Sequence, residues 1–182
     1  EALKIWASYN EDLGPNGHGF RRDESRELQP IAKAAVKGDK NAIAQLYGKC
    51  MELELAINLL LADKTNPALI VEQRPWLEYG KLVAQFGMNV CATAMTDLDK
   101  ASGFVNFDNL YKEARSIQTQ MYNLANSDIL HPHQPGIKVG TLVLIPALNE
   151  IFANTVNAYN AAHNTAYSPI CEYQPYSISS TV

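Results

Sequence analysis

Residues 43–60 read IAQLYGKCMELELAINLL, and the spacing of their apolar side chains decides the fold class. Successive apolar residues are three or four positions apart over about five helical turns, which places them on one side of an α-helix. These residues are Ile43, Leu46, Cys50, Leu53, Ile57 and Leu60. A row this narrow is typical of helices that pack nearly antiparallel at shallow angles. The pattern therefore predicts one long helix of a helical bundle.

Three later segments repeat the same spacing and predict three more long helices. Their apolar positions are Trp76, Tyr79, Val83, Phe86 and Val90 in the first, Phe107, Leu110, Ala114, Ile117, Met121 and Leu124 in the second, and Ile145, Leu148, Phe152, Val156 and Tyr159 in the third. The first segment carries a second apolar row, Ala84, Met88, Cys91 and Met95, so we expect its helix to be buried on two sides. The predicted fold class is all-α: an up-and-down helical bundle with a short leading helix, roughly residues 2–12, and an extended C-terminal linker.

Turn-forming residues predict where the first long helices begin and end. Gly38 is expected to close a helix that starts near Glu24, and Asp39 can cap the next helix. Asn66-Pro67 is expected to stop the second long helix, and Pro75 fits the first turn of the third. These positions agree with the limits of the apolar rows.

The later boundaries are predicted in the same way. Ser102-Gly103 is expected to close the third long helix, and Asn106 or Asp108 to cap the fourth. Residues 130–140 contain two prolines, so we expect a crossing loop there.

Residues 137–145 are apolar and β-branched, which also fits a short strand. Because an isolated strand has no partner, we prefer the entry to the last helix, with a kink at Pro146.

The predicted domain division places the helical bundle at residues 1–164 and a linker toward a further module at residues 165–182. The linker segment has a single charged residue, Glu172, and is rich in Ser, Thr, Tyr and Pro. The chain opens at Glu1 inside a predicted helix, so we expect it to be part of a longer protein. These residues alone do not decide its cellular compartment.

The composition is that of a globular domain, with 182 residues, 47% of them hydrophobic and a formal net charge of −4. We find no long Lys/Arg cluster and no run of roughly 18 apolar residues, so we expect neither a nucleic-acid nor a membrane partner. The three cysteines, Cys50, Cys91 and Cys171, are widely spaced and form no CxxC pair. We expect Cys50 and Cys91 to be core residues rather than part of a disulfide or metal framework.

The most unusual local feature is the run Gly14-Pro-Asn-Gly-His-Gly19, which is followed by Arg21 and Arg22. Three glycines in six residues could form a nest for an anion beside the two arginines. The alternative, which we favour, is a rigid corner that docks against a neighbouring domain. The run is not a P-loop, because the Gly-Lys-Ser/Thr ending is missing.

Isolated histidines give no strong metal signal. His131 and His133 lie one residue apart without a third ligand nearby, and His163 is placed at a helix end where it favours the dipole. We predict no metal-binding and no cofactor-binding residues.

Carboxylate pairs and aromatic residues were considered for glycosidic chemistry. The pairs Asp97/Asp99 and Glu52/Glu54 do not face a pocket that the pattern predicts. Trp76, Tyr79 and Tyr47 could line a sugar groove, although aromatic residues in helical rows usually belong to the core. We therefore predict no catalytic residues in this chain.

Three stretches carry a resemblance to a known family. Residues 10–25, NEDLGPNGHGFRRDES, followed by Gln29-Pro30, closely resemble a segment of bacterial glycoside hydrolase family 84 enzymes. These are β-N-acetylglucosaminidases of the O-GlcNAcase type, some of them first labelled hyaluronidases. Residues 67–76, PALIVEQRPW, and 134–139, QPGIKV, resemble two further turns of that family in the same order. The resemblance covers nearly the whole chain.

This resemblance implies that the chain is a part of a longer enzyme and is separate from its catalytic domain. The family's catalytic domain is a (β/α)₈ barrel, and the region similar to this chain is a helical bundle packed behind it. Its chemistry is retaining and substrate-assisted, with two adjacent aspartates that belong to the barrel. This chain contains no Asp-Asp pair, so no catalytic residue carries over. The matching positions Asn16, His18, Arg21, Arg22 and Glu24 are interpreted as structural.

The resemblance therefore implies a structural and interaction domain that braces the barrel and is not catalytic itself. It also implies an intramolecular partner, the barrel, with a homodimer surface as a further expectation, and export to the periplasm or beyond by analogy with bacterial members. The alternative is an independent carbohydrate- or protein-binding helical module. A brace should expose an apolar face around Leu3, Ile5, Trp6 and Phe20, and we predict that Trp6 is substantially exposed.

Overall fold

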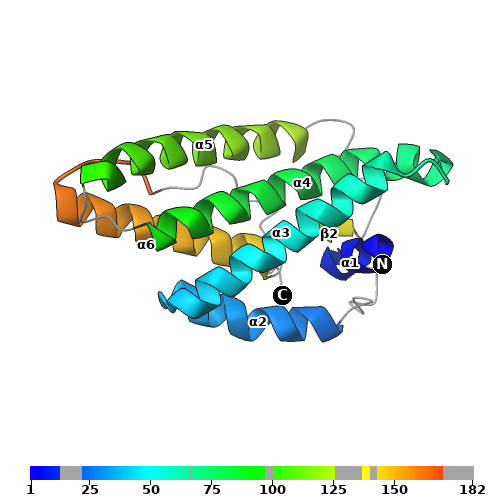
Figure 1. Ribbon diagram of the computed structural model, residues 1–182, viewed down its shortest axis with the longest axis horizontal. Helices are drawn as coiled ribbons and strands as arrows, with labels where there is room; N and C mark the ends of the chain where they lie inside the picture. Colours follow the sequence, from blue (N-terminus) through cyan, green and yellow to red (C-terminus); the bar gives the residue numbers. More distant parts are fainter. Residues whose placement is uncertain (13–21, 66, 97–100, 126–136, 140–142, 170–182) are drawn as a thin grey trace, which may run out of the picture.

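The computed structural model describes residues 1–12, 22–65, 67–96, 101–125, 137–139 and 143–169 (Figure 1). Its elements are α1 (Ala2–Tyr9), β1 (Asn10–Asp12), α2 (Arg22–Val36), α3 (Lys40–Ala62), α4 (Pro67–Met95), α5 (Ala101–Ala125), β2 (Ile137–Val139) and α6 (Leu144–His163). The predicted all-α bundle is confirmed, with the addition of one short strand pair.

Helix α4 is the central helix of the bundle and packs against α3, α5 and α6 (Figure 1). All six residues of the apolar row in α3 are buried, and so are all five of the row in α6. On α4, Ala84 and Cys91 of the second row are buried, Met88 is half-buried and Met95 is exposed. The expected two-sided burial of α4 is therefore confirmed for its middle but not for its C-terminal turn.

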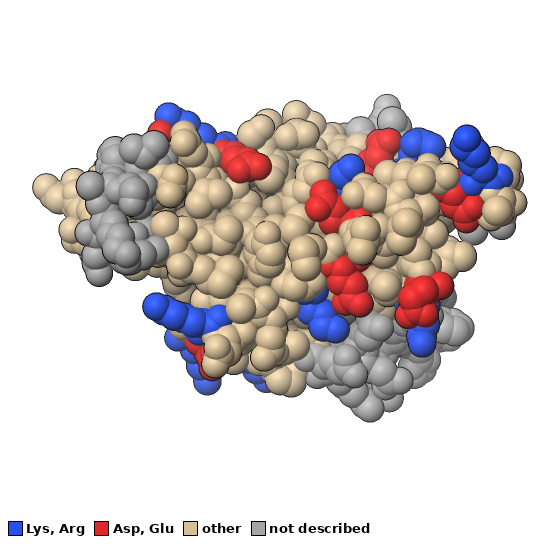
Figure 2. All heavy atoms as spheres, viewed as in Figure 1, with Lys and Arg blue, Asp and Glu red and all other residues tan. Residues whose placement is uncertain are grey.

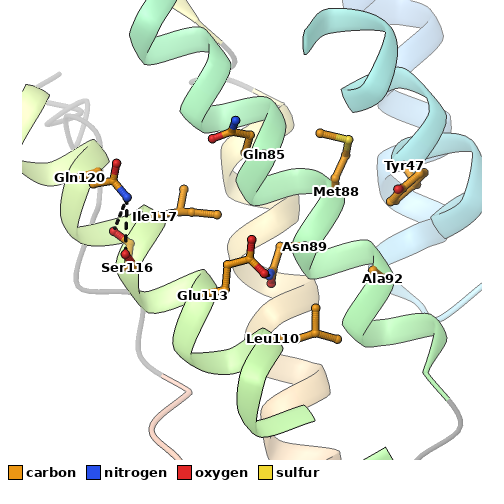
Figure 3. A pocket seen from close by; sticks show the side chains of 10 residues that line it. All are labelled: Tyr47, Gln85, Met88, Asn89, Ala92, Leu110, Glu113, Ser116, Ile117 and Gln120. Carbon is orange, nitrogen blue, oxygen red and sulfur yellow. Dashed lines mark hydrogen bonds between the residues drawn. The ribbon is translucent and has the colours of Figure 1, made fainter. Parts of the chain in front are cut away.

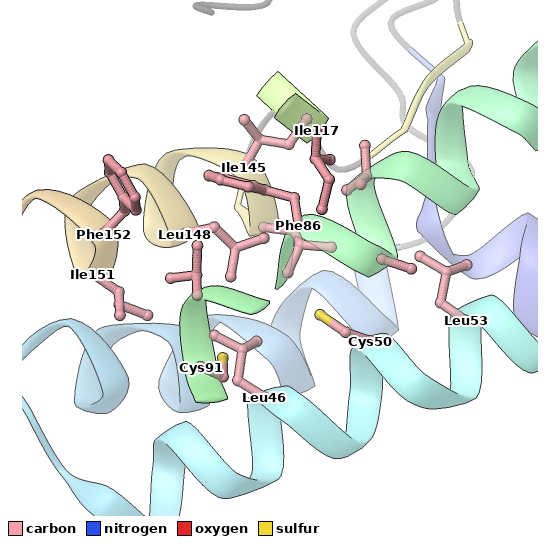
Figure 4. Packing of buried hydrophobic residues seen from close by; sticks show 14 of the residues in the cluster. Leu46, Cys50, Leu53, Phe86, Cys91, Ile117, Ile145, Leu148, Ile151 and Phe152 are labelled. Carbon is pink, nitrogen blue, oxygen red and sulfur yellow. The ribbon is translucent and has the colours of Figure 1, made fainter. Parts of the chain in front are cut away.

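The closest helix–helix contact lies where α4 meets α3. Cys50 of α3 packs toward α4, and Phe86 and Cys91 extend from α4 into the layer between α3 and α6 (Figure 4). A Cβ atom placed on Gly87 would lie 2.3 Å from the Sγ atom of Cys50, so only glycine fits at this point. Burial raises the pKa of both thiols, that of Cys91 to about 12, which keeps them protonated. The predicted core role of Cys50 and Cys91 is confirmed, whereas Cys171 lies outside the described residues.

The prediction that Trp6 is substantially exposed is wrong. Trp6 is only 4% exposed, and its ring lies beside Gly80 of α4, where an added Cβ would be 2.5 Å from the indole Cζ3. The missing side chain at Gly80 leaves a notch that accepts the indole. Helix α1 is consequently an integral part of the bundle that packs on α3, with Leu3 exposed and Ile5 half-buried. Phe20 lies outside the described residues.

The preference for a helix entry over a strand at residues 137–145 is wrong for residues 137–139, whereas Leu144 and Ile145 do begin the last helix, α6. Ile137–Val139 forms strand β2, which pairs antiparallel with β1 in the register Asn10↔Val139, Glu11↔Lys138 and Asp12↔Ile137. The partner strand directly follows α1, which therefore ends at Tyr9 rather than near residue 12. Pro146 lies in the first turn of α6, where a missing N–H breaks no helical hydrogen bond.

Two expected helix boundaries are corrected by the structure. Helix α4 begins at Pro67 and contains Pro75, so Pro67 rather than Pro75 occupies the first turn. Helix α5 begins at Ala101, so Ser102 and Gly103 lie inside it and neither Asn106 nor Asp108 is its cap. The signal that misled the prediction was local turn propensity, which weighs less than burial of the α5 row.

The junction between α2 and α3 follows the prediction. Gly38 has a positive φ of 87° just after α2, as a C-terminal glycine should. The side chain of Asp39 accepts hydrogen bonds from the backbone N–H groups of Asn41 and Ala42, at 2.9 and 3.1 Å, and caps α3.

The described part of the expected C-terminal linker packs on the bundle. The ring of Tyr167 packs edge-on against Phe107 of α5 and Tyr159 of α6, and the side chain of Asn160 hydrogen-bonds to the Tyr167 backbone N–H and carbonyl. The guanidinium of Arg115 donates to the Ser168 carbonyl at 2.7 Å. The packed unit thus extends past the expected boundary at residue 164. A linker role toward a further module remains a prediction.

The hydroxyl of Tyr167 also donates to Asp108 at 2.9 Å. The Lys112 ammonium and this hydroxyl together hold the pKa of Asp108 below its ordinary value, and burial raises the pKa of Tyr167 to about 12, so the donor stays protonated. A carboxyl whose pKa is lower in the folded state than in the unfolded state stabilises the fold. This stabilisation is fully present at pH values above the unfolded-state pKa of about 3.9, and it is lost as pH falls through the folded-state pKa.

We therefore expect Tyr167→Phe, which keeps the ring but removes this donor, to lower the free energy of unfolding at neutral pH. As pH falls through the lowered folded-state pKa of Asp108, the difference from wild type should shrink, because Asp108 then becomes protonated in the folded state as well. Urea denaturation at neutral pH and over a series of acidic pH values measures this. An equal loss at every pH would show that the hydroxyl acts independently of the Asp108 charge.

Candidate functional site

Several residues singled out in the sequence lie outside the described part of the chain. These are the run from Gly14 to Gly19, Arg21 and the pairs Asp97/Asp99 and His131/His133. Arg22 and Glu24 belong to α2, although their side chains are not described. The corner that we expected at residues 14–19 therefore remains a prediction.

The other candidates are described and lie apart from one another. Glu52 is close to Lys49 at 3.9 Å, whereas Glu54 accepts a hydrogen bond from Gln85 of α4 at 2.9 Å. The ring of His163 lies 4.4 Å from that of Tyr159. The described residues contain no group of three or more His, Cys, Asp or Glu side chains that could hold a metal ion. Within the same residues, no helix is long and apolar enough to cross a lipid bilayer.

The three aromatic residues considered for a sugar groove have different surroundings. Tyr79 is 4% exposed and belongs to the core, as expected. Trp76 is half-buried and packs against the core. Tyr47 is half-buried at the edge of a groove of about 550 Å³. We call this the α4–α5 groove.

The α4–α5 groove lies over α4 (Figure 3). Helix α5 forms one wall of the groove, and Tyr47 of α3 lies at the opposite side. Its lining residues are Tyr47, Gln85, Met88, Asn89, Ala92, Leu110, Glu113, Ser116, Ile117 and Gln120. The helical rows position them: Met88 belongs to the second row of α4, and Leu110 and Ile117 belong to the row of α5. Apolar and polar side chains therefore alternate along the groove.

Asn89 is the one buried polar side chain among the ten that line the groove. It is 7% exposed, and its Nδ2 donates a hydrogen bond to Glu113 Oε2 at 3.1 Å. Its Oδ1 atom is buried and has no hydrogen-bond partner. Buried polar atoms are almost always paired, so this unpaired acceptor is unusual. Sequence reasoning missed Asn89, because one polar residue beside an apolar row gives no signal by itself.

The residues that line the groove carry a negative formal charge. Glu113 is the only charged residue among the ten lining residues, which include no Lys, Arg or His. They also include no Ser or Cys beside a His, so this part of the structure offers no nucleophile with a base.

A second surface feature lies on the outer side of α3. Successive apolar or small residues there are three or four positions apart, and we call them the outer row: Ala44, Gly48, Met51, Leu55, Leu59 and Ala62. Met51, Leu55 and Leu59 are 54%, 61% and 58% exposed. Figure 2 shows a broad area without Lys, Arg, Asp or Glu at the centre of the face that α3 crosses.

The outer row was also missed in the sequence, although its spacing was visible there. The inner row of the same helix predicts the helix by itself, so the outer row adds no further secondary-structure signal. A helix with apolar rows on opposite sides can pack on both sides, and an exposed apolar row of this kind is typical of an interaction surface.

The all-helical fold and the exposed outer row define a class, a helical domain with an apolar face on its surface. Residues 24–152 match the family model of the bacterial GH84 post-catalytic domain, where GH84 denotes glycoside hydrolase family 84. Because the match spans more than half of the chain, the chain belongs to this family. The resemblance seen in the sequence is confirmed. Membership implies that the domain associates with a glycosidase catalytic domain in the same chain.

Proposed function

We propose that this helical bundle braces the catalytic (β/α)₈ barrel of a β-N-acetylglucosaminidase and is inactive alone. The parent enzyme would act on O-GlcNAc or hyaluronan-type substrates by the retaining, substrate-assisted route, in which the acetamido oxygen of the substrate attacks. All reacting groups would then belong to the barrel. Export of the parent to the periplasm or beyond is part of the same proposal.

The observation that carries the proposal is the outer row of α3. Full burial of a Leu or Met side chain contributes about 1.5–3 kcal/mol, so covering Met51, Leu55 and Leu59 would favour docking by several kcal/mol. Small residues at both ends of the row, Ala44 and Gly48 at one end and Ala62 at the other, let another helix approach closely. A (β/α)₈ barrel presents an outer ring of helices, which suits helix-on-helix packing.

We assign the barrel as occupant of the outer row because family membership puts it in the same chain. An intramolecular partner is present at high effective concentration and needs less intrinsic affinity than a separate protein. The expected homodimer surface is the competing occupant, and the experiment below distinguishes the two.

The test introduces Leu55→Glu into the full-length parent enzyme, numbered as here, and measures thermal inactivation with a chromogenic β-N-acetylglucosaminide. We expect activity at low temperature to be near wild type and the half-life at elevated temperature to fall severalfold, because a carboxylate would be buried at the barrel contact. Val71→Glu is the matched control, since Val71 is 70% exposed on α4 and lies outside the outer row.

Equal half-lives for the two variants would contradict the proposal. Sedimentation of the wild-type and Leu55→Glu enzymes completes the test. If the wild type is a dimer and Leu55→Glu is a monomer, the outer row binds a second copy and the barrel assignment is wrong.

A further inference from the structure

We propose that residues 165–169 form a clasp that locks α5 onto the bundle, and that α5 opens as a unit once the clasp detaches. This conformational device goes beyond the bracing role and does not depend on it. Three features of the molecule support it: the place of α5 at the edge of the bundle, unpaired polar atoms beneath α5, and the bonds that the clasp makes to two helices.

Helix α5 lies at one edge of the bundle and packs mainly on α4, whereas α4 packs on α3, α5 and α6 (Figure 1). Aromatic side chains connect α5 to α6. The Phe107 ring stacks on that of Tyr159 with 3.6 Å between the ring centroids. A helix that has one close helical neighbour exposes less surface when it detaches than a helix that has three, so it can open without global unfolding.

Unpaired polar atoms weaken the packing of α5. Asn89 Oδ1 on α4 and Gln118 Nε2 on α5 are buried and have no hydrogen-bond partner. The Asn89 amide bonds to Glu113 of α5, so its unpaired oxygen lies at the contact between the two helices. A buried polar atom without a partner costs stability, and it regains a partner from water when the contact opens. Detachment of α5 therefore relieves both atoms.

The clasp makes strong polar contacts with α5. The chain turns back after α6 and runs beside α5 (Figure 1). The Tyr111 hydroxyl and the Arg115 guanidinium both donate to the Ser168 carbonyl, at 3.1 and 2.7 Å. The Tyr167 hydroxyl donates to Asp108 at 2.9 Å. Two of these three bonds involve a charged group, and such hydrogen bonds are stronger than neutral ones.

The clasp is fastened to α6 as well. Asn160 Nδ2 donates to the Tyr167 carbonyl at 2.7 Å, and Asn160 Oδ1 accepts from the Tyr167 N–H at 2.9 Å. The same oxygen accepts from the Thr165 hydroxyl at 2.9 Å. The Tyr167 ring packs edge-on against three rings of the two helices: Phe107, Tyr111 and Tyr159. The clasp therefore connects α5 to α6.

The clasp couples the C-terminal end of the chain to α5. The sequence continues past the clasp with residues 170–182. Detachment of the clasp breaks the bonds to Asp108, Tyr111 and Arg115 together, so a displacement of the C-terminal end is transmitted to α5. Because α5 forms one wall of the α4–α5 groove, its release removes that wall.

Native-state hydrogen exchange of this chain, followed in ¹H–¹⁵N spectra at low urea concentrations, tests the proposal. We expect the α5 amides to exchange faster than those of α3 around Leu46 and Leu53. Their exchange should also depend less on urea, because opening of α5 exposes less surface than global unfolding. The backbone N–H of Tyr167, which reports on the clasp, should exchange at least as fast as the α5 amides.

Two variants weaken the clasp from different helices. Tyr167→Ala removes the bond to Asp108 and should raise the α5 exchange rates at least about tenfold. Asn160→Ala acts from α6 and should raise them at least about threefold, so it decides the question if Tyr167→Ala does not fold. Tyr122→Ala is the matched control, because Tyr122 is on α5 itself and is 51% exposed. It should change the rates by no more than about twofold.

Three results would overturn the proposal. The first is equal exchange rates and equal urea dependence for α5 and α3. The second is slower exchange of the Tyr167 N–H than of the α5 amides, which would mean that α5 opens before the clasp. The third is α5 exchange rates within about twofold of wild type in either clasp variant.

Discussion

Trp6→Ala is expected to lower the free energy of unfolding of this chain by about 3–5 kcal/mol, the usual cost of removing a buried aromatic side chain. Trp6 is 4% exposed, and its ring fills the notch at Gly80 beside Ile57. The bundle cannot collapse into the space that the indole leaves, because α1, α3 and α4 are held by their other contacts. Urea denaturation followed by far-ultraviolet circular dichroism measures the loss.

The matched control for this prediction is Leu3→Ala in the same helix. Leu3 is 52% exposed, so its truncation should change the free energy of unfolding by less than about 0.5 kcal/mol. Similar effects of the two substitutions would mean that α1 does not dock through Trp6.

Gly87→Ala is expected to destabilise the chain by about 1–3 kcal/mol, although alanine favours helix formation over glycine by about 1 kcal/mol. The added Cβ would lie 2.3 Å from Cys50 Sγ and 3.1 Å from Leu148 Cδ1, so α3 and α4 would have to separate slightly. The measurement is again urea denaturation.

Gly48→Ala is the control for this prediction, since it also adds a methyl group in the middle of a helix. An added Cβ at Gly48 has no atom within 4 Å, so this variant should be stabilised by about 0.5–1 kcal/mol. A stabilised Gly87→Ala variant would show that the contact between α3 and α4 is looser than described.

A double variant tests the named contact directly. Combining Gly87→Ala with Cys50→Ala removes the sulfur and leaves the Cys50 Cβ contact of 3.3 Å. We expect the double variant to be more stable than the sum of the single effects predicts, by about 1 kcal/mol. If the effects of the two single substitutions simply add, the strain caused by Gly87→Ala does not come from the Cys50 sulfur.

The helices could be predicted from the sequence because their cause is local. The inner row of α3 repeats at helical spacing, and each of its residues proved to be buried. Asp39 could be assigned as a cap because capping involves only the next few residues.

The errors arose where distant residues decide the structure. A strand at residues 137–139 became stable only because residues 10–12 pair with it, and no local pattern shows that partner. Trp6 is buried because Gly80, on another helix, lacks a side chain. A helix boundary at residues 102–103 was predicted from turn propensity, which packing overrides.

The candidate site was less predictable than the fold. The sequence suggests Tyr47 as a groove residue. The groove itself depends on how α3, α4 and α5 pack together, and the spacing of apolar residues in the sequence does not determine that packing. The unpaired Oδ1 atom of Asn89 is visible only with side chains in place. The outer row of α3, by contrast, could have been found by searching the helix for a second apolar row.

We propose that this chain is a non-catalytic domain that stabilises the catalytic domain of the same enzyme. The most direct test is the hydrolysis of a chromogenic β-N-acetylglucosaminide over time at elevated temperature by this chain, the full-length parent and the catalytic domain alone. We predict no hydrolysis by this chain and a longer active lifetime for the full-length enzyme than for the catalytic domain alone. Hydrolysis by the isolated chain, or equal lifetimes of the two enzymes, would contradict the account.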